Sequence, residues 1–156
     1  MKEAGGDRQA DLRALYQSVI LEHNRAPRNR GAVPGETHRA RGFNPLCGDD
    51  VTVSLRLESD AVAAAGFEGK GCAICTAAAS CMTEVCAGRS VQQLAALAEG
   101  FEAMVRRGEA GTSAGQLEAF APVAGFPSRI KCAILPWRAL VHAMSGDEDV
   151  ATTEDP

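Results

Sequence analysis

Three short segments of the sequence carry side chains that can bind a metal or react as thiolates. Cys47 and Asp49 lie just before an alternating apolar segment. Cys72 follows a Gly-Lys-Gly turn, and Cys132 lies near the start of the last apolar-periodic segment. Three thiolates and a carboxylate suit tetrahedral Zn²⁺, and thiolates also hold iron–sulfur clusters. The spacing is not the paired CxxC pattern of a zinc ribbon, so spacing alone leaves open whether the three segments meet.

Length and composition fit a single domain over residues 1–156. Of the 156 residues, 46% are hydrophobic, which is enough to bury a core without metal or disulfides. The net charge of −4 gives no basic footprint for nucleic acid. No apolar run approaches the roughly 18 residues that span a bilayer, and residues 1–7 lack the apolar core of a signal peptide. We therefore expect a cytoplasmic protein without membrane or nucleic-acid partners, whose six cysteines are ligands, reactive thiols or small buried side chains.

The first half of the chain predicts one helix and three strands. A helical apolar stripe ends before Pro27 and contains Leu12, Leu15, Tyr16, Val19 and Ile20. Residues 51–58 alternate between apolar and polar side chains, which predicts a half-buried strand. Residues 62–67 predict a weaker strand after a turn, and residues 39–43 a third. Short connections between three consecutive strands indicate an antiparallel meander.

The second half predicts helices. Residues 73–87 form a helix closed by Gly88, and Ser90 with Gln93 makes a capping box that opens the next helix. A glycine-containing loop over 108–115 and a short turn near 116–120 follow, and Ser128 is the expected N-cap of the last helix. Strands followed by helices predict an α+β fold, a small three-stranded antiparallel sheet with helices on one face. We expect an ordered core over about residues 10–145 and a solvated, disordered acidic tail over 146–156.

Several motifs in a fixed order carry a resemblance to a known family. They are Leu15-Tyr16 with Val19-Ile20-Leu21-Glu22-His23, Pro27-Arg28-Asn29-Arg30-Gly31, Asn44-Pro45-Leu46-Cys47-Gly48-Asp49, Phe67-Glu68-Gly69-Lys70-Gly71-Cys72-Ala73-Ile74 and Arg129-Ile130-Lys131-Cys132-Ala133. Over about residues 12–144 the chain resembles the iron–sulfur cluster assembly proteins of the IscU/NifU N-terminal family. The resemblance implies an IscU-like fold and a Zn²⁺ bound by Cys47, Asp49, Cys72 and Cys132.

Two features make the chain more similar to the SufU branch of that family. Lys131, rather than histidine, precedes Cys132, and the segment between Cys72 and Cys132 is long. The resemblance implies a zinc-dependent sulfurtransferase in which Cys47 accepts persulfide sulfur from a SufS-like cysteine desulfurase, with other Suf components as further candidate partners. A [2Fe–2S] assembly scaffold would use the same ligands and is the alternative. The sequence does not decide whether the protein is itself an enzyme.

Other residues near the predicted ligands allow two readings each. Arg129 and Lys131 either offset the negative charge of the site or are solvated cations. Cys72 and Cys75 form a CxxC at a helix N-terminus, so a dithiol redox protein or an alternative metal ligand is a competing hypothesis. Otherwise Cys75 is a small residue in the place of a serine.

The remaining cysteines, the histidines and one proline are assigned structural roles. We expect Cys81 and Cys86 to lie in the core, and none of His23, His38 and His142 to be a metal ligand. Pro136 should kink the last helix one turn beyond Cys132, because it removes a helical hydrogen bond.

Overall fold

The three predicted strands form one antiparallel sheet in strand order β1-β2-β3. The computed structural model describes residues 4–108 and 115–154. Its elements are α1 (Ala4–Arg25), β1 (His38–Asn44), β2 (Asp49–Glu58), β3 (Ala61–Lys70), α2 (Ala73–Cys86), α3 (Val91–Arg107), the 3₁₀ helix η1 (Gly115–Gly125) and α4 (Pro127–Ser145). The α+β prediction and the meander are therefore confirmed.

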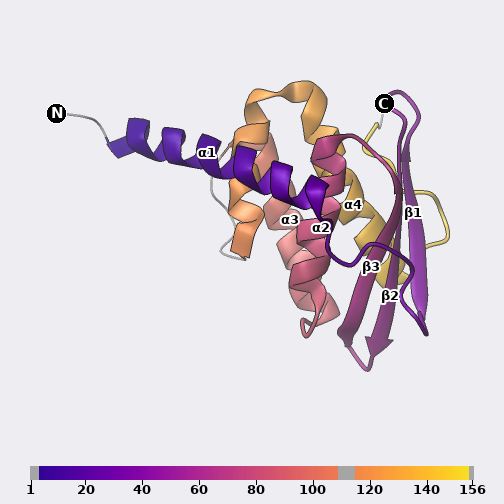
Figure 1. The fold of residues 1–156 in the computed structure, drawn as a ribbon. Coiled ribbons are helices and arrows are strands. Elements are labelled where there is room, and N and C mark those ends of the chain that lie inside the picture. The colour runs from indigo at the N-terminus through magenta and orange to yellow at the C-terminus, as the bar shows by residue number, and fades with distance from the viewer. Residues whose placement is uncertain (1–3, 109–114, 155–156) are drawn as a thin grey trace.

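Alternation along β2 explains which face of the sheet is covered. Val51, Val53 and Leu55 are buried, and Val53 pairs with Ala40 of β1 and with Phe67 of β3. Because successive side chains of a strand point to opposite faces, these residues share the face on which the helices pack. Figure 1 shows the helices gathered on one side of the sheet, as predicted from the sequence.

The helical layer rests on the sheet through α2 and α4. Helix α4 packs on β1 and β2, whereas α2 packs on β3. The approach of α4 is close, since a Cβ added to Gly42 would lie 3.0 Å from Leu135 Cδ1. Behind α4, the ring of Trp137 stacks on Phe101 with centroids 5.1 Å apart. Aromatic stacking of this kind fixes α4 against α3.

Most predicted helix boundaries agree with the structure. The capping box of Ser90 and Gln93 is present, and Gly88 follows α2 with a left-handed φ of 85°. Ser128 is not the N-cap of α4, because the helix begins at Pro127, whose fixed φ suits the first helical position. Helix α4 continues through Pro136, and the predicted kink stays a prediction. The loop predicted over 108–115 lies largely outside the described residues.

Both chain ends differ from the prediction. Residues 4–9, which lie outside the expected ordered core, belong to α1. The acidic tail over 146–154 is not a solvated, disordered segment: Ala151 is buried and forms a parallel bridge with Gly42 of β1. The open edge of β1 supplies unpaired backbone groups that bind the tail, which outweighs its acidic composition. That the whole chain is one domain stays a prediction.

Within residues 4–108 and 115–154, none of the helices combines the length and the apolar character required to cross a membrane.

Gly66 provides a test of how the segment after α1 is held on β3. Phe67 N donates to Asn29 O at 3.1 Å, and Gly31 N donates to Phe67 O at 2.7 Å. A Cβ on Gly66 would lie 2.5 Å from Gly31 O. We expect Gly66→Ala to lower the free energy of unfolding by about 1–3 kcal/mol, because backbone must move. Urea unfolding measures this change. Gly125→Ala is the control, since a Cβ at Gly125 would have no neighbour within 4 Å. Equal losses of unfolding free energy in the two variants would contradict the steric explanation.

Candidate metal centre

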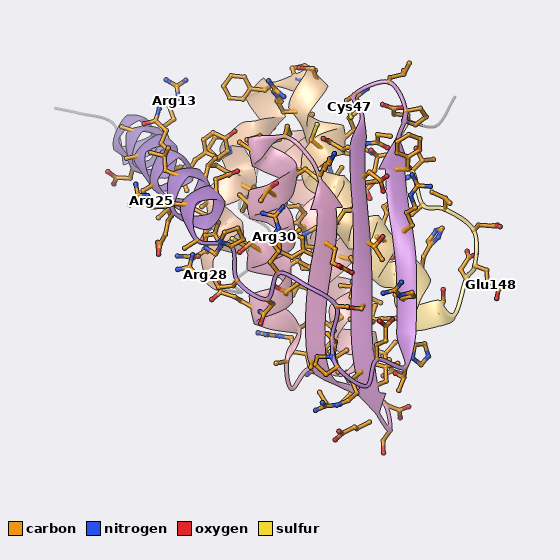
Figure 2. All side chains as sticks on the ribbon, turned by 45° about the vertical axis from the view of Figure 1, so that its right-hand side comes forward. Arg13, Arg25, Arg28, Arg30, Cys47 and Glu148 are labelled. Atoms are coloured by element: carbon orange, nitrogen blue, oxygen red, sulfur yellow. The ribbon has the colours of Figure 1, made fainter. Side chains whose placement is uncertain are left out.

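Segments that are distant in sequence meet where the β1–β2 turn faces α2 and α4. One ligand atom from each of Cys47, Asp49 and Cys132 lies within 4.8 Å of the other two. Cys72 is outside that set of three but is the N-cap of α2 and contacts both Asp49 and Cys132. The four residues expected from the resemblance are therefore neighbours. Figure 2 shows Cys47 at one end of the sheet.

A tight turn separates the environments of Cys47 and Asp49. Gly48 N donates to Asn44 O at 2.7 Å, and Gly48 has a left-handed φ of 81° that glycine adopts without strain. The turn leaves Cys47 exposed, whereas Asp49 starts β2 and is only 2% exposed. The thiol is thus accessible from solvent and the carboxylate is not.

Asp49 carries the main evidence for a bound cation. Its Oδ1 accepts a hydrogen bond from Cys72 N at 2.9 Å. Its Oδ2 is buried and forms no well-aligned hydrogen bond, although the thiols of Cys47 and Cys132 lie beside the carboxylate. A buried carboxylate oxygen without a well-aligned hydrogen bond is costly, and a cation held between it and the neighbouring thiolates removes that cost. The donor set of sulfur and carboxylate oxygen fits Zn²⁺.

The thiols of Cys72 and Cys132 shift each other's pKa in opposite directions. The hydrogen bond with the Cys132 thiol lowers the pKa of Cys72 to about 6, and the backbone N–H of Cys75 assists at 3.5 Å. The same hydrogen bond, together with burial, raises the pKa of Cys132. Burial raises the pKa of Cys47 as well. A metal ion bound between these residues would hold their sulfurs as thiolates, because metal ligands must be deprotonated.

The three other cysteines differ from this set. Cys75 is buried beneath the site, and a Cβ on Gly71 would lie 2.9 Å from its Sγ. Burial first, and then the charge of Asp49, raise the pKa of the Cys75 thiol. Cys81 and Cys86 are buried in α2, where burial raises the pKa of each to about 12. The core assignment of Cys81 and Cys86 is confirmed, and Cys75 is a protonated thiol next to the site.

The two predicted cations have different surroundings. Arg129 is exposed, and its charge acts on the Tyr16 hydroxyl, whose pKa is nevertheless raised by burial. Lys131 Nζ lies 3.3 Å from Glu154 Oε2 in the tail, so its charge is paired there. A role for either cation in balancing the charge of the site stays a prediction.

The histidines have structural contacts. His23 is fully buried, with Nδ1 2.6 Å from Ser80 Oγ and Nε2 2.7 Å from Gln116 Oε1. Neither His38 nor His142 belongs to the group that can hold a metal among the described residues. His23 therefore has a structural role in the interior.

Glu154 is a residue of the site that was not expected from the sequence. Its carboxylate accepts hydrogen bonds from the backbone N–H groups of Leu46 and Cys47, at 2.9 and 3.2 Å. One local signal was the β-branched pair Thr152-Thr153 beside Ala151, which favours extended structure. The neighbouring acidic residues favoured a disordered tail instead.

Comparison with known proteins places these residues in a family. Residues 15–133 match the family described as the NifU-like N-terminal domain. The chain is 37% identical over 141 residues to the zinc-dependent sulfurtransferase SufU of Bacillus subtilis, covering 89% of this chain and 95% of that protein. It is also 37% identical to the iron–sulfur cluster assembly scaffold protein IscU of Streptococcus pyogenes, covering 85% and 84% of the two chains.

A solved structure shows the same fold. The crystal structure from Fervidobacterium islandicum AW-1, described as an iron–sulfur cluster assembly scaffold protein for the SUF system, superposes with a TM-score of 0.77 and 28% identity. The match covers 84% of this chain and 97% of that one. The IscU-like fold expected from the sequence is confirmed.

The buried Oδ2 of Asp49 predicts that one substitution will lower Zn²⁺ affinity and raise the stability of the metal-free protein. We expect Asp49→Asn to reduce Zn²⁺ affinity at least about tenfold, since even outer-shell changes at metal sites cost about 10- to 100-fold. In metal-free protein the same change should raise the free energy of unfolding, because a buried charge disappears. A competing chromophoric chelator and urea unfolding measure the two effects. Asp50→Asn is the control, since Asp50 pairs with Arg41 at the surface; unchanged affinity in Asp49→Asn would contradict the assignment.

Proposed function

Because this chain belongs to the NifU-like N-terminal domain family, we propose that it is a zinc-dependent sulfurtransferase of iron–sulfur cluster assembly. In this proposal Cys47, Asp49, Cys72 and Cys132 hold Zn²⁺, and a cysteine desulfurase supplies persulfide sulfur to Cys47. The observation that carries it is the buried Asp49 oxygen, without a well-aligned hydrogen bond, among three neighbouring thiols. The proposed compartment is the cytoplasm, where thiols stay reduced.

Exposure of the ligands supports Cys47 as the sulfur acceptor. Cys47 is the exposed cysteine of the four proposed ligands, whereas Cys72 is half-buried and Cys132 is buried. A donor persulfide carried on another protein can reach only an accessible thiolate. Zn²⁺, when bound, keeps the thiols of its ligands deprotonated at neutral pH.

The transfer is a thiol exchange that needs no external oxidant. The Cys47 thiolate attacks the outer sulfur of the donor persulfide, and a bond forms between Cys47 Sγ and that sulfur. The donor's S–S bond breaks, and its cysteine leaves as a thiolate. The transferred sulfur keeps its proton, so one negative charge enters and one leaves the step.

Two other functions compete with sulfur transfer. The relative from S. pyogenes is named a scaffold, and a [2Fe–2S] cluster would use the same thiolates. A dithiol redox protein would need Cys75 to attack Cys72, yet Cys75 is buried and burial raises the pKa of its thiol. Because the thiolate is the attacking species, the geometry favours sulfur transfer over dithiol chemistry.

Metal analysis together with desulfurase assays separates sulfur transfer from the scaffold function. We expect one zinc per chain in protein purified in air, and stimulation of the partner desulfurase. Cys47→Ser should abolish both this stimulation and the mass increase of one sulfur atom on the chain, because the acceptor is lost. Cys86→Ser is the control, since Cys86 lies at the end of α2 in the hydrophobic core of the protein. Brown, iron-containing protein that does not stimulate the desulfurase would support the scaffold instead.

A separate substitution tests the dithiol hypothesis. Cys75→Ser should keep desulfurase stimulation within about twofold, since a buried protonated thiol takes no part in thiol exchange. The assay compares initial rates at equal zinc occupancy. A loss of activity comparable with that of Cys47→Ser would restore the dithiol hypothesis.

A further inference from the structure

The tail segment, residues 147–154, runs back along α4 to the β1–β2 turn. The chain reverses at Gly146, which has a left-handed φ of 72°. Ala151 then pairs with β1: Phe43 N donates to Ala151 O at 2.8 Å, and Ala151 N donates to Arg41 O at 2.9 Å. The tail segment therefore forms an isolated parallel bridge at the edge of β1, in line with the path of the chain in Figure 1.

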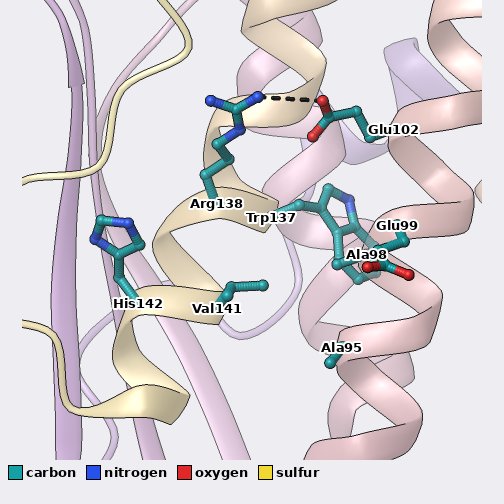
Figure 3. Close-up of a pocket in the computed structure, with 8 residues that line it drawn as sticks. All are labelled: Ala95, Ala98, Glu99, Glu102, Trp137, Arg138, Val141 and His142. Atoms are coloured by element: carbon teal, nitrogen blue, oxygen red, sulfur yellow. Dashed lines mark hydrogen bonds and ion pairs between the residues drawn. The ribbon is translucent and has the colours of Figure 1, made fainter.

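One face of α4 holds the tail segment. His142 Nδ1 lies 3.1 Å from Asp149 O, and Arg138 Nη1 donates to Thr152 O at 3.1 Å. Arg138 also pairs with Glu102 of α3 at 3.1 Å, as Figure 3 shows. Residues 131, 138 and 142 are spaced by seven and four positions, which places them on the same side of a helix. The helix that carries Cys132 thus also fixes the path of the tail segment.

Asn44, the residue before the turn, is bound to the tail segment by its side chain. The Asn44 side chain is fully buried, and its Oδ1 accepts from Thr152 Oγ1 at 3.0 Å and from Thr153 N at 2.9 Å. Its Nδ2 donates to Thr153 Oγ1 at 2.7 Å, and that hydroxyl donates to Lys131 O at 2.9 Å. Both polar atoms of the Asn44 side chain are therefore bonded to the tail segment, so the turn starts from a fixed residue.

Glu154 completes the attachment at the turn itself. Its side chain is only 6% exposed, although Leu46 beside it is 84% exposed. Oε1 accepts from Leu46 N at 2.9 Å, and Oε2 accepts from Cys47 N at 3.2 Å and lies 3.3 Å from Lys131 Nζ. A carboxylate that binds two consecutive N–H groups is a charge-assisted contact and fixes the orientation of that peptide.

We propose that Glu154 is a positioning residue for Cys47. By binding the N–H groups of Leu46 and Cys47, it holds the exposed turn in the conformation that keeps Cys47 Sγ near Asp49 and Cys132. Lys131 neutralises this carboxylate, so that no uncompensated negative charge is added beside the thiolates. The importance of this position for sulfur transfer rests on the proposed function, whereas its effect on the turn does not.

The experiment compares three substitutions in the full chain. Glu154→Ala removes the carboxylate, Glu154→Gln keeps one acceptor oxygen without the charge, and Glu148→Gln is the control with the same change of charge. Glu148 is exposed in the same tail segment, and its side chain points away from the fold in Figure 2. Amide hydrogen exchange at residues 46–47 and the rate of Cys47 alkylation are measured in metal-free protein, and Zn²⁺ affinity by chelator competition.

We expect Glu154→Ala to raise amide exchange at residues 46–47 about tenfold, the effect of losing a charge-assisted hydrogen bond. Alkylation of Cys47 should become faster and Zn²⁺ binding weaker, while exchange in β2 and β3 stays unchanged. Glu154→Gln should give intermediate values, and Glu148→Gln should match the unmodified chain.

Other outcomes overturn the proposal. It fails if exchange at residues 46–47 and Zn²⁺ affinity stay unchanged in Glu154→Ala, or if Glu148→Gln has the same effect. If Glu154→Ala does not fold, Glu154→Gln decides by the same two measurements. If the local effects appear but no variant, including the unmodified chain, stimulates a desulfurase, the positioning role stands and the proposed function fails.

Discussion

The buried carboxylate of Asp49 is the constraint on which the rest of the site depends. A negative charge at the first residue of β2, with one oxygen bonded to Cys72 N and the other without a well-aligned hydrogen bond, is stable only beside protons or a cation. The surrounding elements supply both: thiols whose pKa values are perturbed by one another, and a donor set that a metal ion can bind. Asp49 thus lies where the first turns of α2 and α4 approach the same end of the sheet.

Helix α4 both carries a proposed metal ligand and binds the tail segment. It carries Cys132 toward Asp49, and through Lys131 and Arg138 it binds the tail segment that returns to the β1–β2 turn. Stacking of Trp137 on Phe101 fixes the helix from behind. A shift of α4 would move a ligand and the support of the exposed turn together, so the two parts of the site are mechanically coupled.

Local features of the sequence predicted local structure, and distant contacts escaped it. The alternation of Val51, Val53 and Leu55 identified β2 because one face of that strand is buried, and the capping box of α3 depends on Ser90 and Gln93 alone. Convergence of the cysteine segments needs contacts across more than half of the chain, which spacing cannot encode; the family resemblance supplied it. The tail was misjudged because its pairing depends on the edge of β1 and not on its own composition.

The unequal exposure of the ligands suggests a division of roles within one site. Cys132 and Asp49 are buried, where packing holds them in place, whereas Cys47 lies on an exposed turn that the core does not support. A thiol that must meet another protein has to be accessible, but a ligand has to be held. Glu154 reconciles the two requirements, because it fixes the backbone of the turn and leaves the sulfur of Cys47 free of the core. The side chain of Cys47 is thus accessible to a partner, while the peptide between Leu46 and Cys47 is held in place by Glu154.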